Sequence, residues 1–173
     1  MFLQQELMQQ ASKGSFAEIA SKDGAAELKQ NWLAQPRATR KDPAQQAAYV
    51  QQLLDQGMFA DAEKILIESQ KSGPNALLVP LFKQIKLPNP AASISKLENW
   101  LKHDELNVDL LSALANVANH AGDKVLAEKA LAKAIKLDNR QEDLLLMASI
   151  KESQHDDSHA LQLYKQSLAQ QKP

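Results

Sequence analysis

Two histidines, His155 and His159, are four residues apart with two aspartates between them. On one face of a helix, histidines at this spacing could bind a metal ion. The surrounding pattern, however, predicts a turn between two helices at Asp156 and Asp157, and a turn would separate the two rings. An aspartate in such a turn can cap the helix that follows it. The favoured interpretation is therefore a solvated turn, and we predict no metal site.

The sequence has no other pattern typical of catalysis or cofactor binding. It contains no cysteine, which excludes disulfides, thiolate metal sites and Cys-x-x-Cys-His haem attachment. It has no Gly-rich dinucleotide motif, no nucleophile elbow and no phosphate-binding loop. Met8, Met58 and Met147 are interpreted as core residues rather than haem ligands. We predict that the protein is not an enzyme and has no catalytic residues and no cofactor.

The composition favours a soluble, all-α protein. Ala, Leu, Gln, Lys and Glu dominate the chain, and these residues lose little side-chain entropy in a helix. The net charge of −1 argues against nucleic-acid binding, because such proteins usually carry a large excess of positive charge. The longest apolar run, Ala76 to Phe82, is too short to cross a bilayer. The first residues also lack the basic and hydrophobic segments of a signal peptide.

The clearest repeat unit runs from Val108 to Gln141 and consists of two helices on either side of a turn. In that turn, Gly122 suits the left-handed position that ends a helix, and Asp123 can cap the next helix. The apolar residues of each helix follow helical periodicity and predict one buried stripe per helix. They are Leu111, Leu114, Ala115 and Ala118 in the first helix and Ala127, Leu131 and Ala134 in the second.

The pattern of the second helix recurs twice elsewhere in the chain. A small residue is followed four positions later by a large one, and three positions after that by another small one. The two further sets are Ala62, Leu66 and Ser69, and Ala160, Tyr164 and Ser167. Small side chains let two antiparallel helices approach closely. The spacing of Ala62, Ala127 and Ala160 indicates a repeat of about 34 residues, with a degenerate unit in the middle.

That middle unit is predicted as a helix from Ala76 to Lys86, a break at Pro88-Asn89-Pro90, and a helix from Ala91 to Lys102. The second of these helices should bury Ile94, Leu97 and Leu101. Trp100 stands where the other units have a small residue, so the packing there should differ.

The N-terminal part is predicted as a helix from Phe2 to Lys22, followed by a helix from Asp23 to Gln35. The second helix should turn Leu28, Trp32 and Leu33 inward. Next comes a basic connector from Pro36 to Pro43, and a further helix starts at Pro43. The cluster Arg37, Arg40 and Lys41 in this connector is interpreted as solvated, with acidic lipid or a protein partner as the alternative.

The predicted architecture is therefore an all-α solenoid of five antiparallel hairpins in one domain, residues 1–173. The hairpins cover residues 1–35, 43–73, 75–103, 107–138 and 141–171.

The unit from Val108 to Gln141 resembles a tetratricopeptide repeat. It matches that family at the Leu, Leu-Ala, Gly-Asp, Ala, Leu, Ala and Leu-Asp positions described above. Asn139 stands where the family usually has proline, whereas Pro74 fills the corresponding place after the unit that begins at Ala44. The resemblance implies a right-handed superhelix of hairpins that binds other proteins.

More specifically, the chain resembles the C-terminal repeat domain of bacterial HemY proteins. The resemblance begins at Glu27 to Arg40, a stretch that reads ELKQNWLAQPRATR, and continues through Asp42-Pro43 and Ala47-Ala48-Tyr49. It extends through Ala62-Glu63-Lys64, Leu77-Leu78-Val79-Pro80 and Asn89-Pro90.

The resemblance to HemY proteins implies an association with haem and porphyrin biosynthesis, with haem-pathway enzymes as partners. It also implies that the chain is a soluble fragment of a bacterial inner-membrane protein whose N-terminal membrane helices are missing. The flavin-dependent protoporphyrinogen oxidase of the same name is a different protein, because its dinucleotide motif is absent here.

The predicted functional surface is the concave face formed by the first helices of stacked hairpins. It should bind a protein or peptide, with Asn116 and Asn119 hydrogen-bonding to an extended chain. Ser112 stands where the carboxylate clamp of chaperone adaptors would have lysine, which disfavours that role. The predicted partner-binding residues are Gln51, Asp55, Asp109, Ser112, Asn116, Asn119 and Asp143.

Two other functions stay open at this point. One is a porphyrin- or haem-binding carrier, and the other is an architectural spacer. Self-association through exposed end hairpins is a further alternative, although the Lys- and Gln-rich segment from Gln162 to Pro173 suggests a solvated cap.

Overall fold

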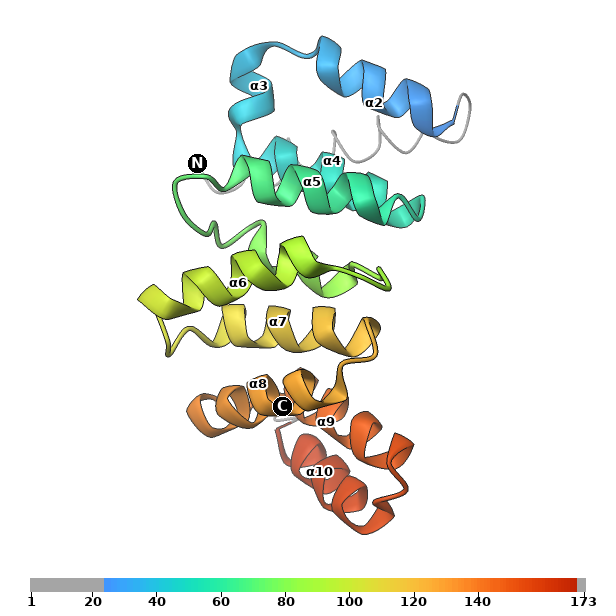
Figure 1. Ribbon diagram of the computed structural model, residues 1–173, viewed down its shortest axis with the longest axis vertical. Helices are drawn as coiled ribbons and strands as arrows, with labels where there is room; N and C mark the ends of the chain where they lie inside the picture. Colours follow the sequence, from blue (N-terminus) through green and yellow to red (C-terminus); the bar gives the residue numbers. More distant parts are fainter. Residues whose placement is uncertain (1–23, 171–173) are drawn as a thin grey trace. The chain divides into compact units, whose positions relative to one another are not determined.

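The computed structural model describes residues 24–170, and it divides into two compact units, Met1–Leu87 and Pro88–Pro173 (Figure 1). All regular elements within the described residues are helical and none is a strand, which confirms the all-α class. The predicted helix from Phe2 to Lys22 and the cap Asp23 lie outside the described residues. No helix between residues 24 and 170 is long and apolar enough to span a lipid bilayer.

The first unit contains α2 (Ala25–Ala34), α3 (Arg37–Lys41), α4 (Pro43–Asp55), α5 (Phe59–Ser69) and the 3₁₀ helix η1 (Val79–Gln84). Leu28 and Trp32 of α2 are buried as predicted, and the Trp32 ring stacks on Tyr49 of α4 with centroids 4.6 Å apart. The prediction for Leu33 was wrong, because 58% of this residue is exposed. Leu33 follows Trp32 by one residue and therefore points about 100° away from it around the helix.

The predicted connector between α2 and α4 folds as the short helix α3. Arg40 connects α3 to the end of α2 and to α4 by hydrogen bonds. Its Nε donates to the carbonyl oxygen of Gln35, which follows α2 (3.1 Å), and its carbonyl oxygen accepts from Nε2 of Gln46 in α4 (2.8 Å). Asp42 then caps α4 by accepting from the Ala44 amide, and Pro43 is the first residue of the helix, as predicted.

The predicted α-helix from Ala76 to Lys86 was wrong, because only η1 forms there. Pro80 has no N–H, and in an α-helix its ring would clash with the carbonyl of Ala76. The Asn75 side chain also accepts a hydrogen bond from the Leu77 amide (2.8 Å), which holds a turn where the helix would begin. Val79 and Phe82 of η1 are nevertheless buried, so the apolar residues of this segment still enter the core.

The second unit contains α6 (Ala91–His103), α7 (Val108–His120), α8 (Lys124–Leu137), α9 (Gln141–Ser153) and α10 (Asp157–Ala169). Each helix packs against its neighbour in the chain, most extensively in the hairpins α7–α8 and α9–α10. In α6 the predicted span is confirmed and Leu97 and Trp100 are buried, while Ile94 and Leu101 are half-buried.

One turn geometry joins three of the helix pairs. In α4–α5, α7–α8 and α9–α10, three residues separate a first helix of 13 residues from the second helix. The last residue of each turn donates its amide to a carbonyl five positions earlier: Met58 to Leu53 (2.8 Å), Asp123 to Ala118 (2.9 Å) and Asp156 to Lys151 (2.9 Å). The middle residue is left-handed each time: Gly57, Gly122 and His155. This is the Schellman motif, and it satisfies carbonyl groups at the helix end.

Ala62, Ala127 and Ala160 are equivalent, as predicted. Each is the fourth residue of the second helix of its pair, and each is at most 2% exposed. Sequence analysis missed the fourth member of this set, Ser93, which is fully buried near the start of α6 and precedes the buried Leu97 by four residues. The middle unit therefore has a small residue, Ser93, at the first position of the pattern and departs from it only at the last position, where Trp100 replaces a small residue.

Candidate partner-binding surface

Gln51 and Asp55, the predicted partner-binding residues of the first unit, bond within that unit. Gln51 Nε2 donates to Asp55 Oδ1 and to Gln84 Oε1, both at 2.9 Å. Gln84 Nε2 donates in return to Gln51 Oε1 at 3.0 Å. This reciprocal amide pair links α4 to η1 and uses the oxygen and the nitrogen of the Gln51 side chain. The exposed Asp55 carboxylate retains acceptor capacity toward solvent.

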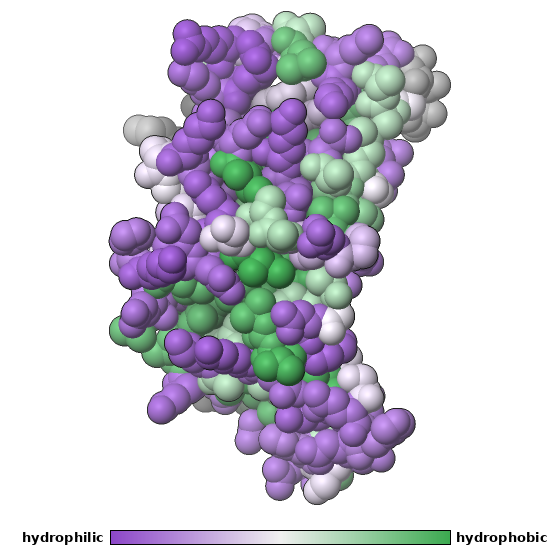
Figure 2. All heavy atoms as spheres, in the orientation of Figure 1, coloured by the Kyte–Doolittle hydropathy of each residue, from purple (hydrophilic) through white to green (hydrophobic). Residues whose placement is uncertain are grey.

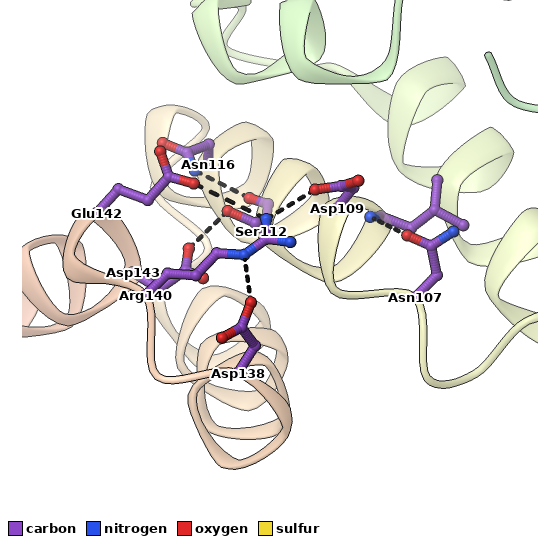
Figure 3. Close-up of polar contacts among 9 residues, drawn as sticks. Asn107, Asp109, Ser112, Asn116, Asp138, Arg140, Glu142 and Asp143 are labelled. Carbon is purple, nitrogen blue, oxygen red and sulfur yellow. Dashed lines mark hydrogen bonds and ion pairs between the residues drawn. The ribbon is translucent and has the colours of Figure 1, made fainter. Parts of the chain in front are cut away.

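In the second unit, Asp109 at the start of α7 pairs with Arg140, which precedes α9 (Figure 3). Arg140 Nη1 lies 2.7 Å from Asp109 Oδ1, and Arg140 Nε lies 2.9 Å from Asp138 Oδ2. Hydrogen bonds to Asp109 and then to Asp138 raise the pKa of Arg140 above its already high ordinary value. The guanidinium group therefore connects α7 to the link between α8 and α9.

Ser112 and Asp143 were predicted to contribute to a partner-binding surface, but both are buried, with exposed fractions of 0% and 1%. Ser112 Oγ donates to Asp143 Oδ1 at 2.6 Å, which joins α7 to α9 (Figure 3). The register of the repeat placed both residues on a concave surface open to a partner. It did not show that the two first helices pack on each other there, and a buried carboxylate requires such a partner.

Asn116 and Asn119 remain partly exposed, yet their side chains already bond locally. Asn116 Nδ2 donates to the Ser112 carbonyl oxygen (2.9 Å), and Asn119 Oδ1 accepts from Lys124 Nζ across the turn. An extended peptide would have to compete with these contacts. The seven predicted residues are therefore used largely in contacts within their own units.

The second unit has an open groove that sequence analysis did not predict. It has a volume of about 270 Å³ and lies where α6 and α8 both pack against α7. Its apolar lining consists of Leu101, Leu111, Leu114, Leu126 and Ala130. Figure 2 shows hydrophobic side chains gathered over α6, α7 and α8 between polar margins.

The two edges of this groove differ in charge. The α8 edge carries Lys129 and Lys133, which are one turn apart and exposed. The α6 edge carries Lys102 together with Glu98 and Glu105. The α8 edge is therefore uniformly basic, whereas the α6 edge is mixed. The four-residue spacing of Leu126 and Ala130 could have indicated this second apolar face on α8, beside the face that carries Ala127 and Leu131.

Across residues 24–170, no three histidine, aspartate or glutamate side chains are grouped closely enough to hold a metal ion. The turn interpretation of His155 and His159 is confirmed. Asp156 accepts from the His159 amide at 3.3 Å and so caps α10, and His155 is the left-handed residue of the same turn.

No protein-family model and no curated protein matches this chain. The resemblance to tetratricopeptide repeats and to HemY proteins rests on the residues quoted in the sequence analysis.

Proposed function

We propose that this chain is a protein-interaction module of tetratricopeptide type, whose hairpins stack into a solenoid, and that it is not an enzyme. The shared three-residue turns and the buried small residues of α5, α8 and α10 support the repeat architecture. Repeat arrays of this kind use their helix faces and grooves to bind partners. The observation that carries the proposal is the open apolar groove of α6, α7 and α8.

The occupant proposed for this groove is an amphipathic helix of a partner protein with acidic residues along one edge. Binding of a helix in a groove uses apolar residues spaced by one helical turn, which here would rest on Leu101 and Leu126, the half-buried leucines of the lining. Acidic residues at i and i+4 on that helix would face Lys129 and Lys133, which have the same one-turn spacing. Electrostatic complementarity of this kind fixes the orientation of a partner and speeds its association.

The resemblance to HemY proteins supports a biological context. On that basis the partner belongs to the haem biosynthetic pathway, and the longer protein is anchored in the bacterial inner membrane. The groove lining favours a peptide over haem, because none of its residues is histidine, methionine, cysteine or tyrosine, the usual axial ligands of haem iron.

The proposal is tested by isothermal titration of the chain with two probes. One is a helical peptide with leucines on one face and glutamates along one flank, and the other is each haem-pathway enzyme in turn. Lys129→Glu with Lys133→Glu should abolish binding of the glutamate peptide, and a matched peptide with lysines on the flank should then bind. Lys71→Glu with Lys136→Glu is the control, since it makes the same charge change at exposed lysines outside the groove.

Three outcomes would reject parts of this proposal. If neither the peptide nor any enzyme binds, the interaction role is wrong. If Asn116→Ala with Asn119→Ala abolishes binding and the lysine reversals do not, the groove is not the site. A saturable Soret shift on titration with hemin would instead favour the carrier function.

A further inference from the structure

Five charged side chains line the α6–α7–α8 groove, and all five are exposed. Within residues 24–170, none of these five side chains makes an ion pair or a hydrogen bond. Glu128, which also lies on α8, differs from them because it pairs with Lys151 of α9 at 3.4 Å. The charges at the groove edges are therefore available to a ligand. They are Glu98, Lys102 and Glu105 at the α6 edge, and Lys129 and Lys133 at the α8 edge.

The two edges have an opposite excess of charge on either side of an apolar floor. Helix α7 packs against both α6 and α8 and contributes Leu111 and Leu114 to the lining (Figure 1). On one side, Glu98 and Glu105 outnumber the single Lys102, so the α6 edge is negative overall. On the other side, α8 contributes two lysines and no acidic residue. A ligand that fills the groove therefore meets positive charge along one flank and mostly negative charge along the other.

A partner helix lying in the groove would present one flank of its apolar face to each edge. Acidic residues on the first flank would face Lys129 and Lys133. Acidic residues on the second flank would face Glu98 and Glu105, and like charges placed opposite each other weaken the binding of an unsuitable partner. Basic residues on the second flank would instead form ion pairs with the two glutamates. The charge of the second flank therefore decides how well a helix fits this groove.

We propose that Glu98 and Glu105 determine the specificity of the groove, and that its partner is an amphipathic helix with acidic residues on one flank of the apolar face and basic residues on the other. This inference rests on the proposed function, which concerns only the flank that faces the lysines. The glutamates select among helices that share the same apolar face and the same acidic flank. A helix that is acidic on both flanks is rejected by the α6 edge.

Isothermal titration of the whole chain with three helical peptides of matched helicity tests the inference. All three peptides have the same leucine face and the same glutamate flank, and their second flank carries lysines, glutamines or glutamates. The lysine-flanked peptide should bind about three- to tenfold more tightly than the glutamine-flanked one, as expected for two exposed ion pairs. The glutamate-flanked peptide should bind most weakly. The differences should shrink at high salt, because exposed charges are screened.

Charge reversal on the chain identifies the residues responsible. Glu98→Lys with Glu105→Lys should reverse the order, so that the glutamate-flanked peptide binds most tightly. The control, Glu27→Lys with Glu68→Lys, makes the same charge change at exposed glutamates of the first unit and should keep the original order. All four glutamates are exposed, so both variants should retain the circular dichroism of the parent chain.

The outcomes separate this inference from the proposed function. If none of the three peptides binds, both are overturned. If the three peptides bind the parent chain equally well, the groove is a helix-binding site but its α6 edge does not select partners, and only this inference is overturned. The same conclusion follows if the original order persists in the Glu98 and Glu105 variant, or if the control variant also reverses it.

Discussion

Gly122 and His155 occupy the same position in two turns of equal length, with φ angles of 85° and 61°. Both turns close with the same pair of backbone hydrogen bonds, so the left-handed conformation is required by the hairpin and not by the residue. A residue with a Cβ pays a conformational cost there that glycine does not. The turn between α9 and α10 therefore holds a strained residue that its equivalents lack.

We expect His155→Gly to stabilise the second unit by about 0.5–1 kcal/mol, because the relief of strain exceeds the added chain entropy of the unfolded state. Gly122→Ala should destabilise by about 1–2 kcal/mol. No atom lies within 4 Å of a Cβ placed on Gly122, so this cost is conformational and not steric. Urea unfolding followed by circular dichroism measures both. Gln154→Gly, at a residue with negative φ, is the control and should not stabilise.

The helices of the second unit were predictable because their signals are local. Helical periodicity, the cap Asp123 and the left-handed Gly122 all act within a few residues of the chain. The buried alanines followed from the same periodicity. The absence of an α-helix at Ala76 is also a local effect of Pro80. The expected helix placed Pro80 at its fifth position, where the proline ring would clash with the carbonyl of Ala76, four residues earlier.

The candidate site was less predictable because it depends on which faces meet. The register of the repeat placed Ser112 and Asp143 on a partner-binding face of α7 and α9, whereas the structure buries both and makes them bonding partners. The groove is likewise formed by three helices. Lys102 on α6 and Lys129 on α8 both line it, but no pattern in the sequence indicates that these two residues lie near each other. Hydrophobic periodicity indicates which side of a helix is buried, but it does not indicate which other residues that side contacts.

Ala127→Leu is expected to destabilise the second unit by about 1–3 kcal/mol, because Ala127 is fully buried where paired helices approach closely. Ala132→Leu introduces the same side chain at an exposed position of the same helix and should change stability by less than about 0.5 kcal/mol. Thermal melts of the two variants provide the comparison. Equal melting temperatures would show that Ala127 does not mark a close helix contact.

The buried hydrogen bond between Ser112 and Asp143 should make the two residues energetically coupled. Asp143→Ala removes the acceptor of this buried hydrogen bond and is expected to cost about 1–3 kcal/mol. Ser112→Ala leaves the carboxylate without one donor and should cost about 1–3 kcal/mol. The double variant should be less destabilised than the sum of the two, and a double-mutant cycle by urea unfolding measures this coupling. Additive losses would mean that the 2.6 Å contact contributes little.

Tyr49 should ionise only at strongly alkaline pH. Its side chain is buried against Trp32, and this desolvation, with a smaller contribution from the negative charge of Asp61, raises its pKa from 10.0 to about 12. The folded chain therefore holds this proton more tightly than the unfolded chain does. The resulting stability is fully present below pH 10 and is lost as the pH rises from 10 toward 12.

The measurement requires a single reporting tyrosine. Tyr164 also has a raised pKa, because it hydrogen-bonds to Glu152, so Tyr164→Phe leaves Tyr49 as the only tyrosine in the chain. Tyrosinate absorbance of this variant should rise near pH 12, or together with loss of the helical circular dichroism signal. In denaturant the same group should titrate near pH 10, its ordinary value. Ionisation near pH 10 with the helical signal intact would show that Tyr49 is solvated and that α2 does not cover it.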